Sequence, residues 1–152
     1  MSEISPRIDY KKQHRPALAG LYELEQFVEA AGIDQSLLEL IKLRASQING
    51  CAFCIDMHTK DARKAGESEQ RLYALSAWRE TPFYTDRERI ALQWTEALTL
   101  IAQNEVSDRL YCAAKEQFGE DGLVALTMAI VSINSWNRLA ISFRTVPGSY
   151  NA

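Results

Sequence analysis

The chain of 152 residues contains few of the residues that interrupt or cross-link small folds, with 7 glycines, 4 prolines and 3 cysteines. Low glycine and proline contents argue against a disordered protein, and 47% hydrophobic residues are enough to form an ordered core. A core of this size needs no disulfide bonds to be stable. We therefore expect one domain over residues 1–152.

The sequence also lacks an excess of positive charge, because its formal net charge is −3. This excludes a general basic surface for nucleic acid or anionic membranes. The first ten residues lack the apolar core of a secretory signal, and the most apolar run, Leu123 to Ile133, is too short to span a bilayer. These absences predict a cytoplasmic protein that binds a small neutral substrate or a protein partner. In that compartment a cysteine pair is more often catalytic or metal-binding than structural.

Alternation of apolar and polar residues, the mark of strands, is not sustained anywhere in the sequence. The apolar positions instead recur at helical spacing, and the pattern predicts an all-α bundle of about six to seven helices after an N-terminal arm over residues 1–15. The expected helices are 16–31, 34–48, a cysteine-bearing helix that ends at 66, 68–79, one that begins at 85, 107–118, and one from about 123 to 143.

Two of these helices carry further signals. Thr85 and Glu88 match a capping box at the start of the fifth helix, whose predicted inward face ends at Ile101. The last helix is apolar nearly all round from Leu123 to Ile133, which predicts burial at the domain centre or in a subunit interface.

The stretch Asn49 to His58 contains two of the three cysteines and one of the two histidines. In a helix, Cys51, Cys54 and His58 would share one stripe. Gly50 indicates a turn that opens this helix, and the unpaired N–H groups of a first turn favour a thiolate. Two thiols at this spacing can form a disulfide, with the histidine as proton partner, so the stretch predicts a redox site.

Other interpretations of the cysteines are weaker. Tetrahedral zinc would need a fourth ligand, for which Cys112 and His14 are isolated candidates, and a c-type haem site would need histidine where Ile55 stands. Cys51 and Cys54 as small buried apolar residues remain a structural alternative. We expect neither cofactor nor metal, and no catalytic role for Cys112 or His14.

Glu39 is ambiguous from spacing alone, which favours a solvated carboxylate beside Lys42 on a helix surface. A carboxylate turned toward His58 would instead orient the imidazole and exchange its proton. The three tryptophans need only core roles, at positions Trp78, Trp94 and Trp136.

The segment Leu43 to His58 resembles the alkylhydroperoxidase AhpD-like branch of the carboxymuconolactone decarboxylase family. Segments 86–97 and 134–138 are similar to further parts of that family. The family motif has a glutamate twelve residues before the first cysteine, a position that Glu39 occupies here.

The resemblance implies an all-α fold, a homotrimer or homohexamer, and a hydroperoxide substrate. It implies that Cys54 attacks the peroxide, that Cys51 resolves the intermediate as a disulfide, and that Glu39 and His58 relay protons. An unidentified thiol or disulfide reductant protein would then restore the thiols. The best-known members have an additional histidine between the cysteines where this chain has Ala52 and Phe53, a difference that bears on the relay and on the reductant.

Thiol peroxidase or disulfide oxidoreductase is therefore the predicted activity. Two alternatives stay open at this stage. One is a lactone decarboxylase-like enzyme in which His58 and Glu39 perform acid/base work, although the decarboxylases of the family lack the cysteine pair. The other is a non-enzymatic redox sensor or a zinc-bound module.

Overall fold

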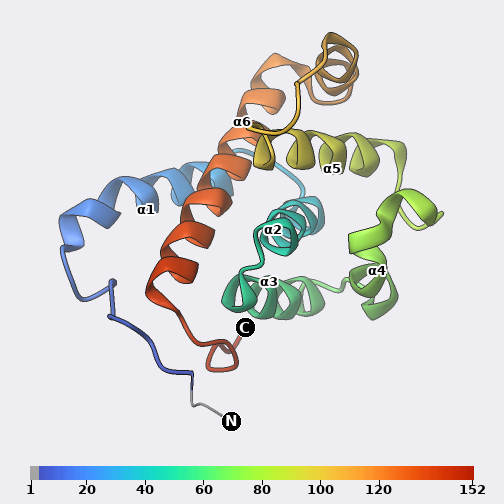
Figure 1. Ribbon diagram of the computed structural model, residues 1–152. Helices are drawn as coiled ribbons and strands as arrows, with labels where there is room; N and C mark the ends of the chain where they lie inside the picture. Colours follow the sequence, from blue (N-terminus) through green and yellow to red (C-terminus); the bar gives the residue numbers. More distant parts are fainter. Residues whose placement is uncertain (1–3) are drawn as a thin grey trace.

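The computed structural model describes residues 4–152, and no β-strand occurs among them. The prediction of an all-α fold is confirmed (Figure 1). The helices are α1 (Arg15–Ala30), α2 (Gln35–Asn49), α3 (Ala52–Lys64), α4 (Glu69–Ala74), the 3₁₀ helix η1 (Leu75–Glu80), α5 (Asp86–Thr99) and α6 (Asp108–Phe143).

Helix α2 is the central element of the bundle. Figure 1 shows it nearly end-on in the middle of the fold, and it packs against α3, α5 and α6. The Asp34 side chain caps its start by accepting a hydrogen bond from the Leu37 N–H at 3.1 Å, and Gly50 ends it with a φ of 70°. Because neighbours surround α2, charged residues on it must find partners inside the protein.

The start of α5 was predicted correctly, since Thr85 and Glu88 form the capping box. Two predictions nearby were wrong. Residues 68–79 do not form one helix, because α4 gives way to the 3₁₀ helix η1 at Leu75. Ile101 is 62% exposed rather than inward-facing, because α5 ends at Thr99.

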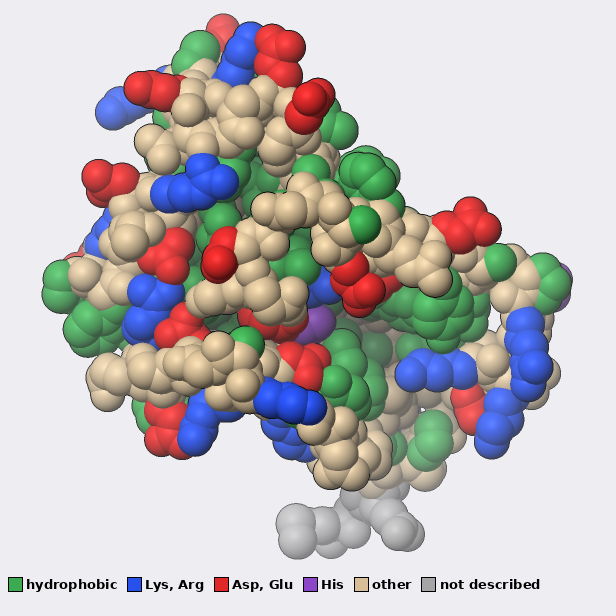
Figure 2. Space-filling view, turned by 180° about the vertical axis from the view of Figure 1, so that it is seen from behind, with side chains coloured by type: hydrophobic (Ala, Val, Ile, Leu, Met, Phe, Trp, Pro, Cys, Tyr) green, Lys and Arg blue, Asp and Glu red, His purple; other side chains and the backbone are tan. Residues whose placement is uncertain are grey.

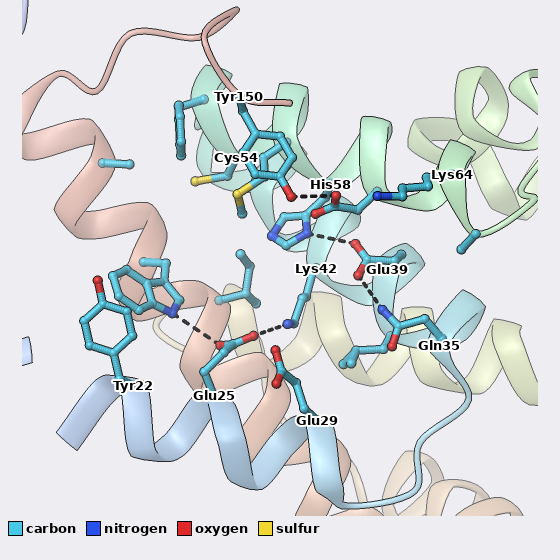
Figure 3. A pocket seen from close by; sticks show the side chains of 18 of the residues that line it. Tyr22, Glu25, Glu29, Gln35, Glu39, Lys42, Cys54, His58, Lys64 and Tyr150 are labelled. Atoms are coloured by element: carbon cyan, nitrogen blue, oxygen red, sulfur yellow. Dashed lines mark hydrogen bonds and ion pairs between the residues drawn. The ribbon is translucent and has the colours of Figure 1, made fainter. Parts of the chain in front are cut away.

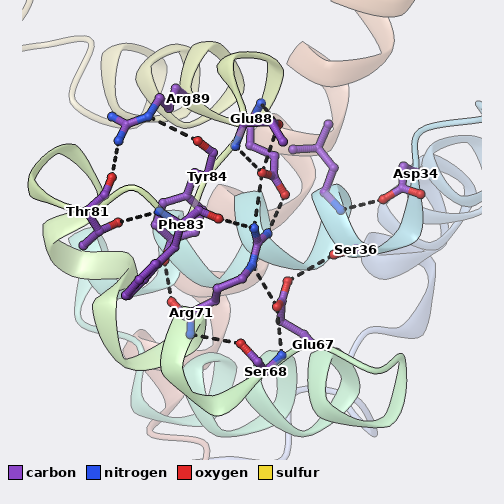
Figure 4. A network of polar contacts seen from close by, with 12 residues as sticks. Asp34, Ser36, Glu67, Ser68, Arg71, Thr81, Phe83, Tyr84, Glu88 and Arg89 are labelled. Carbon is purple, nitrogen blue, oxygen red and sulfur yellow. Dashed lines mark hydrogen bonds and ion pairs between the residues drawn. The ribbon is translucent and has the colours of Figure 1, made fainter.

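A network of charged side chains fixes α4 against the start of α5 (Figure 4). The Arg71 guanidinium donates hydrogen bonds to Glu67 at 2.9 Å and to Glu88 at 2.5 Å. Glu88 also accepts a hydrogen bond from the Thr85 N–H, so the same carboxylate caps α5 and binds α4. This network lies away from the cysteines and supports the frame of the bundle.

Helix α6 bends at Gly119, where two separate helices were predicted to meet. Gly119 has φ 69° and ψ 176°, a conformation that is essentially restricted to glycine. Beyond the bend, Leu126, Ala129 and Ile130 are buried in the core. By length and composition alone α6 could cross a membrane, but core helices of soluble proteins pass the same test.

The Gly119→Ala variant is expected to lose about 1–3 kcal/mol of stability, because a side chain is strained in this conformation. No atom lies within 4 Å of the added Cβ, so the loss comes from the backbone and not from a clash. Gly20→Ala in α1 is the control, since Gly20 also has open space but a helical backbone. Chemical denaturation should show a lower midpoint for Gly119→Ala only, and equal midpoints would contradict the assignment of strain.

Residues 4–14 form no helix, and they lie beside the C-terminal end of α6. The Arg7 N–H donates a hydrogen bond to the Phe143 carbonyl at 3.0 Å, and the Tyr10 ring packs on the Phe143 ring with centroids 5.5 Å apart. Tyr10 is consequently buried. The segment thereby brings two side chains, Tyr10 and Lys11, to the cavity described below.

Candidate active site

A disulfide joins Cys51 and Cys54 at the N-terminus of α3, with their Cα atoms 5.3 Å apart. Cys51 is the N-cap residue, and its Sγ accepts a hydrogen bond from the Cys54 N–H at 3.3 Å. The left-handed backbone of Gly50 lets the chain turn directly from α2 into α3. Both cysteines are almost fully buried, at 1% and 2% exposed.

Amide side chains that are partly or fully buried hold this turn against α6. The Asn49 Nδ2 donates to the Asn137 Oδ1 at 2.8 Å and to the Asn134 Oδ1 at 3.0 Å. Asn137 is fully buried and donates in turn to the Ser46 Oγ at 3.0 Å. The segment that carries the cysteines is thus fixed to α6 immediately before the first cysteine.

Cys54, but not Cys51, lines a cavity of about 740 Å³ between α1, α2, α3 and α6. Figure 2 shows a histidine side chain at the bottom of a hollow on this face, among acidic and hydrophobic side chains. The apolar part of the cavity wall includes Leu38, Phe53, Met57, Ile133, Trp136 and Ala140. Figure 3 places Cys54, His58 and Tyr150 at one end and Glu25, Glu29 and Lys42 at the other.

His58 and Glu39 form a hydrogen bond inside this cavity, with 2.9 Å between the His58 Nδ1 and the Glu39 Oε2. Both residues are only 4% exposed. Gln35 donates to the other Glu39 oxygen at 2.8 Å and so fixes the carboxylate. The interpretation of Glu39 as a solvated surface carboxylate was wrong, because α2 is buried on this side.

The second nitrogen of His58, Nε2, is buried and has no hydrogen-bond partner among residues 4–152. With the Nδ1 proton directed at Glu39, the Nε2 lone pair is free to accept a proton. The pair can therefore take a proton at one end and balance the resulting positive charge with the Glu39 carboxylate at the other. His58 stands four residues after Cys54 on α3, and both side chains line the same cavity.

A second buried pair joins Lys42 of α2 to Glu25 of α1. Lys42 is 5% exposed, so the surface position predicted for it was also wrong. Burial acts to raise the pKa of Glu25, but the Lys42 ammonium together with hydrogen bonds from Ser132 and Trp136 outweighs it, and the pKa lies below its usual value. The Trp136 indole N–H donates to the same carboxylate at 3.3 Å. Trp136 therefore lines the cavity wall in addition to the core role predicted for it.

Tyr150, near the C-terminus, is a cavity residue that the sequence did not indicate. Its hydroxyl donates a hydrogen bond to the Asp61 Oδ1 at 2.7 Å, and this bond raises the pKa of Tyr150 to about 12. The phenol therefore keeps its proton near neutral pH and keeps donating to Asp61. No motif marks Tyr150; the one available signal is an aromatic residue in a polar tail.

The two isolated zinc-ligand candidates in the sequence, His14 and Cys112, lie outside this site. His14 occupies the N-cap position of α1 without a capping hydrogen bond from its side chain, Cys112 is an exposed free thiol on α6, and neither lines the cavity. Glu39, His58 and Asp61 offer ligand atoms within 4.8 Å of one another, which makes them the possible cation-binding group of the described residues. The His58 nitrogen that faces Glu39 is already hydrogen-bonded to it.

Comparisons of this chain with known proteins agree on one family. The sequence model of the carboxymuconolactone decarboxylase family matches residues 16–97. The uncharacterized protein YdfG of Bacillus subtilis is 45% identical over 139 residues, which cover 91% of this chain and 95% of YdfG.

Two solved structures share the fold. ATU0492 of Agrobacterium tumefaciens, a protein of unknown function suggested to be the antioxidant defence protein AhpD, superposes with a TM-score of 0.91 at 42% identity over 96% of this chain and 100% of that one. The debrominase Bmp8 has a TM-score of 0.78 at 19% identity over 89% of this chain and 73% of its own, which shows the fold alone. The chain thus belongs to the carboxymuconolactone decarboxylase family and has its AhpD-like all-α fold.

Proposed function

We propose that the protein is a thiol-dependent peroxidase that reduces hydroperoxides through a Cys51–Cys54 disulfide cycle. The observation that carries this proposal is the position of Cys54, which is bonded to a second cysteine and lines the same cavity as His58. The likeness to ATU0492 supports a role in antioxidant defence. The sequence of steps follows from the chemistry of these side chains.

In the first step the Cys54 thiol passes its proton to the His58 Nε2, and the resulting thiolate attacks the peroxide, so that an S–O bond forms and the O–O bond breaks. Cys54 becomes a sulfenic acid, and the leaving alkoxide takes a proton from the His58 and Glu39 pair to become an alcohol. The Cys51 thiol then attacks the Cys54 sulfur, which forms the disulfide and releases water. An external dithiol restores both thiols by exchange and is itself oxidised.

The cavity favours an organic hydroperoxide as the substrate. Its volume of about 740 Å³ is far larger than hydrogen peroxide requires, and aromatic and aliphatic side chains form much of its wall. Phe53 adds to this wall at the position between the two cysteines. The charges in the lining nearly balance and give no excess of positive charge for an anionic peroxide, since four carboxylates stand beside three lysines: Glu25, Glu29, Glu39 and Asp61, and Lys11, Lys42 and Lys64.

Counting thiols tests the cycle directly. The reduced protein has three thiols, and one equivalent of cumene hydroperoxide is expected to remove two of them, with Cys112 remaining free. Mass spectrometry should then find the Cys51–Cys54 disulfide and one equivalent of cumyl alcohol. The proposed cycle would be refuted if the Cys112 thiol were among those lost, or if alcohol formed while all three thiols stayed intact.

A decarboxylase-like acid/base enzyme is the second candidate, favoured by the direct hydrogen bond between His58 and Glu39. In that reaction the imidazole would exchange a proton with a carboxylated lactone, and the cysteines would be spectators. The two functions are separable because only the peroxidase needs the thiols.

We further propose a cytoplasmic homo-oligomer, a trimer or hexamer, that a thiol or disulfide reductant protein regenerates. Large apolar side chains are exposed on two neighbouring helices, which supports self-association: Tyr22 and Phe27 on α1, and Val124, Val131 and Ile141 on α6.

A further inference from the structure

The last residues of the chain fold back over the outer side of α3. Three hydrogen bonds fasten this C-terminal segment, residues 144–152, to that helix. The Gly148 N–H donates to the Asp56 Oδ2 at 3.0 Å, the Lys60 ammonium donates to the Tyr150 carbonyl at 2.9 Å, and the Tyr150 hydroxyl donates to the Asp61 Oδ1. All three partners lie on α3, so the segment contacts the helix that carries Cys54 and His58.

Tyr150 separates two hollows of the protein. On one side it lines the cavity that contains Cys54, and on the other it lines a surface groove of about 930 Å³ on α3. It is the one residue that the linings of both hollows share. Figure 3 shows its ring beside Cys54 and His58. The Tyr150 side chain is therefore the partition between the groove and the thiol site.

The rest of the cavity wall is harder to displace. Most of it comes from side chains of four packed helices, α1, α2, α3 and α6, and the Tyr10 side chain is buried against Phe143. Tyr150, by contrast, is only partly buried and lies on a segment that forms neither helix nor strand. Segments held by a few polar contacts open at a low free-energy cost.

We propose that Tyr150 is a specificity-determining residue that selects, by size, which thiols and electrophiles reach the Cys54 sulfur. This inference rests on the proposed thiol chemistry of Cys54. In a disulfide exchange the incoming sulfur must approach the Cys54 sulfur, which is only 2% exposed and lies at the end of the cavity that Tyr150 borders. When Tyr150 leaves its place, the groove and the cavity join, and the Cys51–Cys54 pair opens to larger reagents.

Alkylation rates test this gate without any peroxide. The reduced protein, with Cys112→Ser to remove the exposed thiol, is treated with N-ethylmaleimide or with fluorescein-5-maleimide, which have the same reactive group and different sizes. Peptide mass spectrometry follows the labelling of Cys54. For Tyr150→Ala we expect the rate ratio of the large to the small reagent to rise about tenfold, equivalent to ~1.4 kcal/mol of activation free energy.

Two further variants make the result decisive. Tyr73→Ala, which removes an exposed tyrosine on α4, should leave the ratio unchanged. Asp56→Ala releases the segment at Gly148 while it keeps the Tyr150 ring and the bond from Lys60 to the Tyr150 carbonyl, and should raise the ratio less than Tyr150→Ala does. Ratios equal to the parent value in both Tyr150→Ala and Asp56→Ala overturn the gate. Because the assay needs no turnover, a raised ratio in a protein that consumes no peroxide would keep the gate and refute only the peroxidase.

Discussion

The Cys54→Ser variant is expected to lose hydroperoxide turnover by at least ~10³-fold, because a serine hydroxyl does not form the nucleophilic anion that attacks the O–O bond. The substitution is nearly isosteric in a buried position, so the fold should persist. Consumption of cumene hydroperoxide in the presence of dithiothreitol measures the effect. Turnover that survives the substitution unchanged would refute the assignment of Cys54 as the attacking thiol.

Two comparisons define what the loss means. Cys112→Ser removes an exposed thiol outside the cavity and should leave turnover unchanged. With no external thiol present, reduced Cys51→Ser should reduce about one peroxide per chain and stop at the sulfenic acid, whereas the parent stops at the disulfide, because the variant lacks the resolving thiol. If the double Cys51→Ser and Cys54→Ser variant acts on a carboxylated lactone as well as the parent does, the acid/base alternative gains the support that the peroxidase loses.

The second large effect is expected at the proton relay. Glu39→Gln should lower kcat for hydroperoxide by about 10²- to 10⁴-fold, the usual contribution of general acid/base catalysis. The amide can still hold the His58 ring, but it cannot balance the positive charge that His58 acquires with a proton. Steady-state kinetics with a saturating dithiol measure kcat and KM separately, and the loss should fall on kcat.

Glu29→Gln is the matched control for this variant. Glu29 lines the same cavity from α1 and is exposed, and Figure 3 shows it at the opposite end from Cys54. The same chemical change there should alter kcat little. Equal losses in both variants would show that cavity charge in general, and not the bond between Glu39 and His58, supports the reaction.

Local signals in the sequence predicted much of the fold. Asp34, Thr85 and Gly50 mark helix ends by their own hydrogen bonding or backbone freedom, and the structure places each at such an end. The cysteine turn was predictable for the same reason, because it lies within one short stretch. Ile101 shows the limit of periodicity as a signal. The apolar pattern of α5 continues to this residue, although the helix ends before it.

Burial and long-range partners were not predictable in this way. From the sequence, Glu39 and Lys42 resemble a pair on the surface of α2. The packing of α1, α3 and α6 around that helix instead gives each of them a different buried partner. The family resemblance placed Glu39 in the site, but nothing similar existed for Tyr150. Its bond to Asp61 spans 89 residues of sequence, so no local pattern could contain it.

The position of Cys51 at the start of α3 has a kinetic consequence. The helical turn already sets the two cysteine Cα atoms at 5.3 Å, within the usual range for a disulfide. The resolving thiol therefore stands at a high effective molarity beside any sulfenic acid on Cys54, and little backbone motion separates the reduced and oxidised states. Such an arrangement should capture the sulfenic acid before a second peroxide oxidises it irreversibly, which would protect the protein during bursts of oxidant.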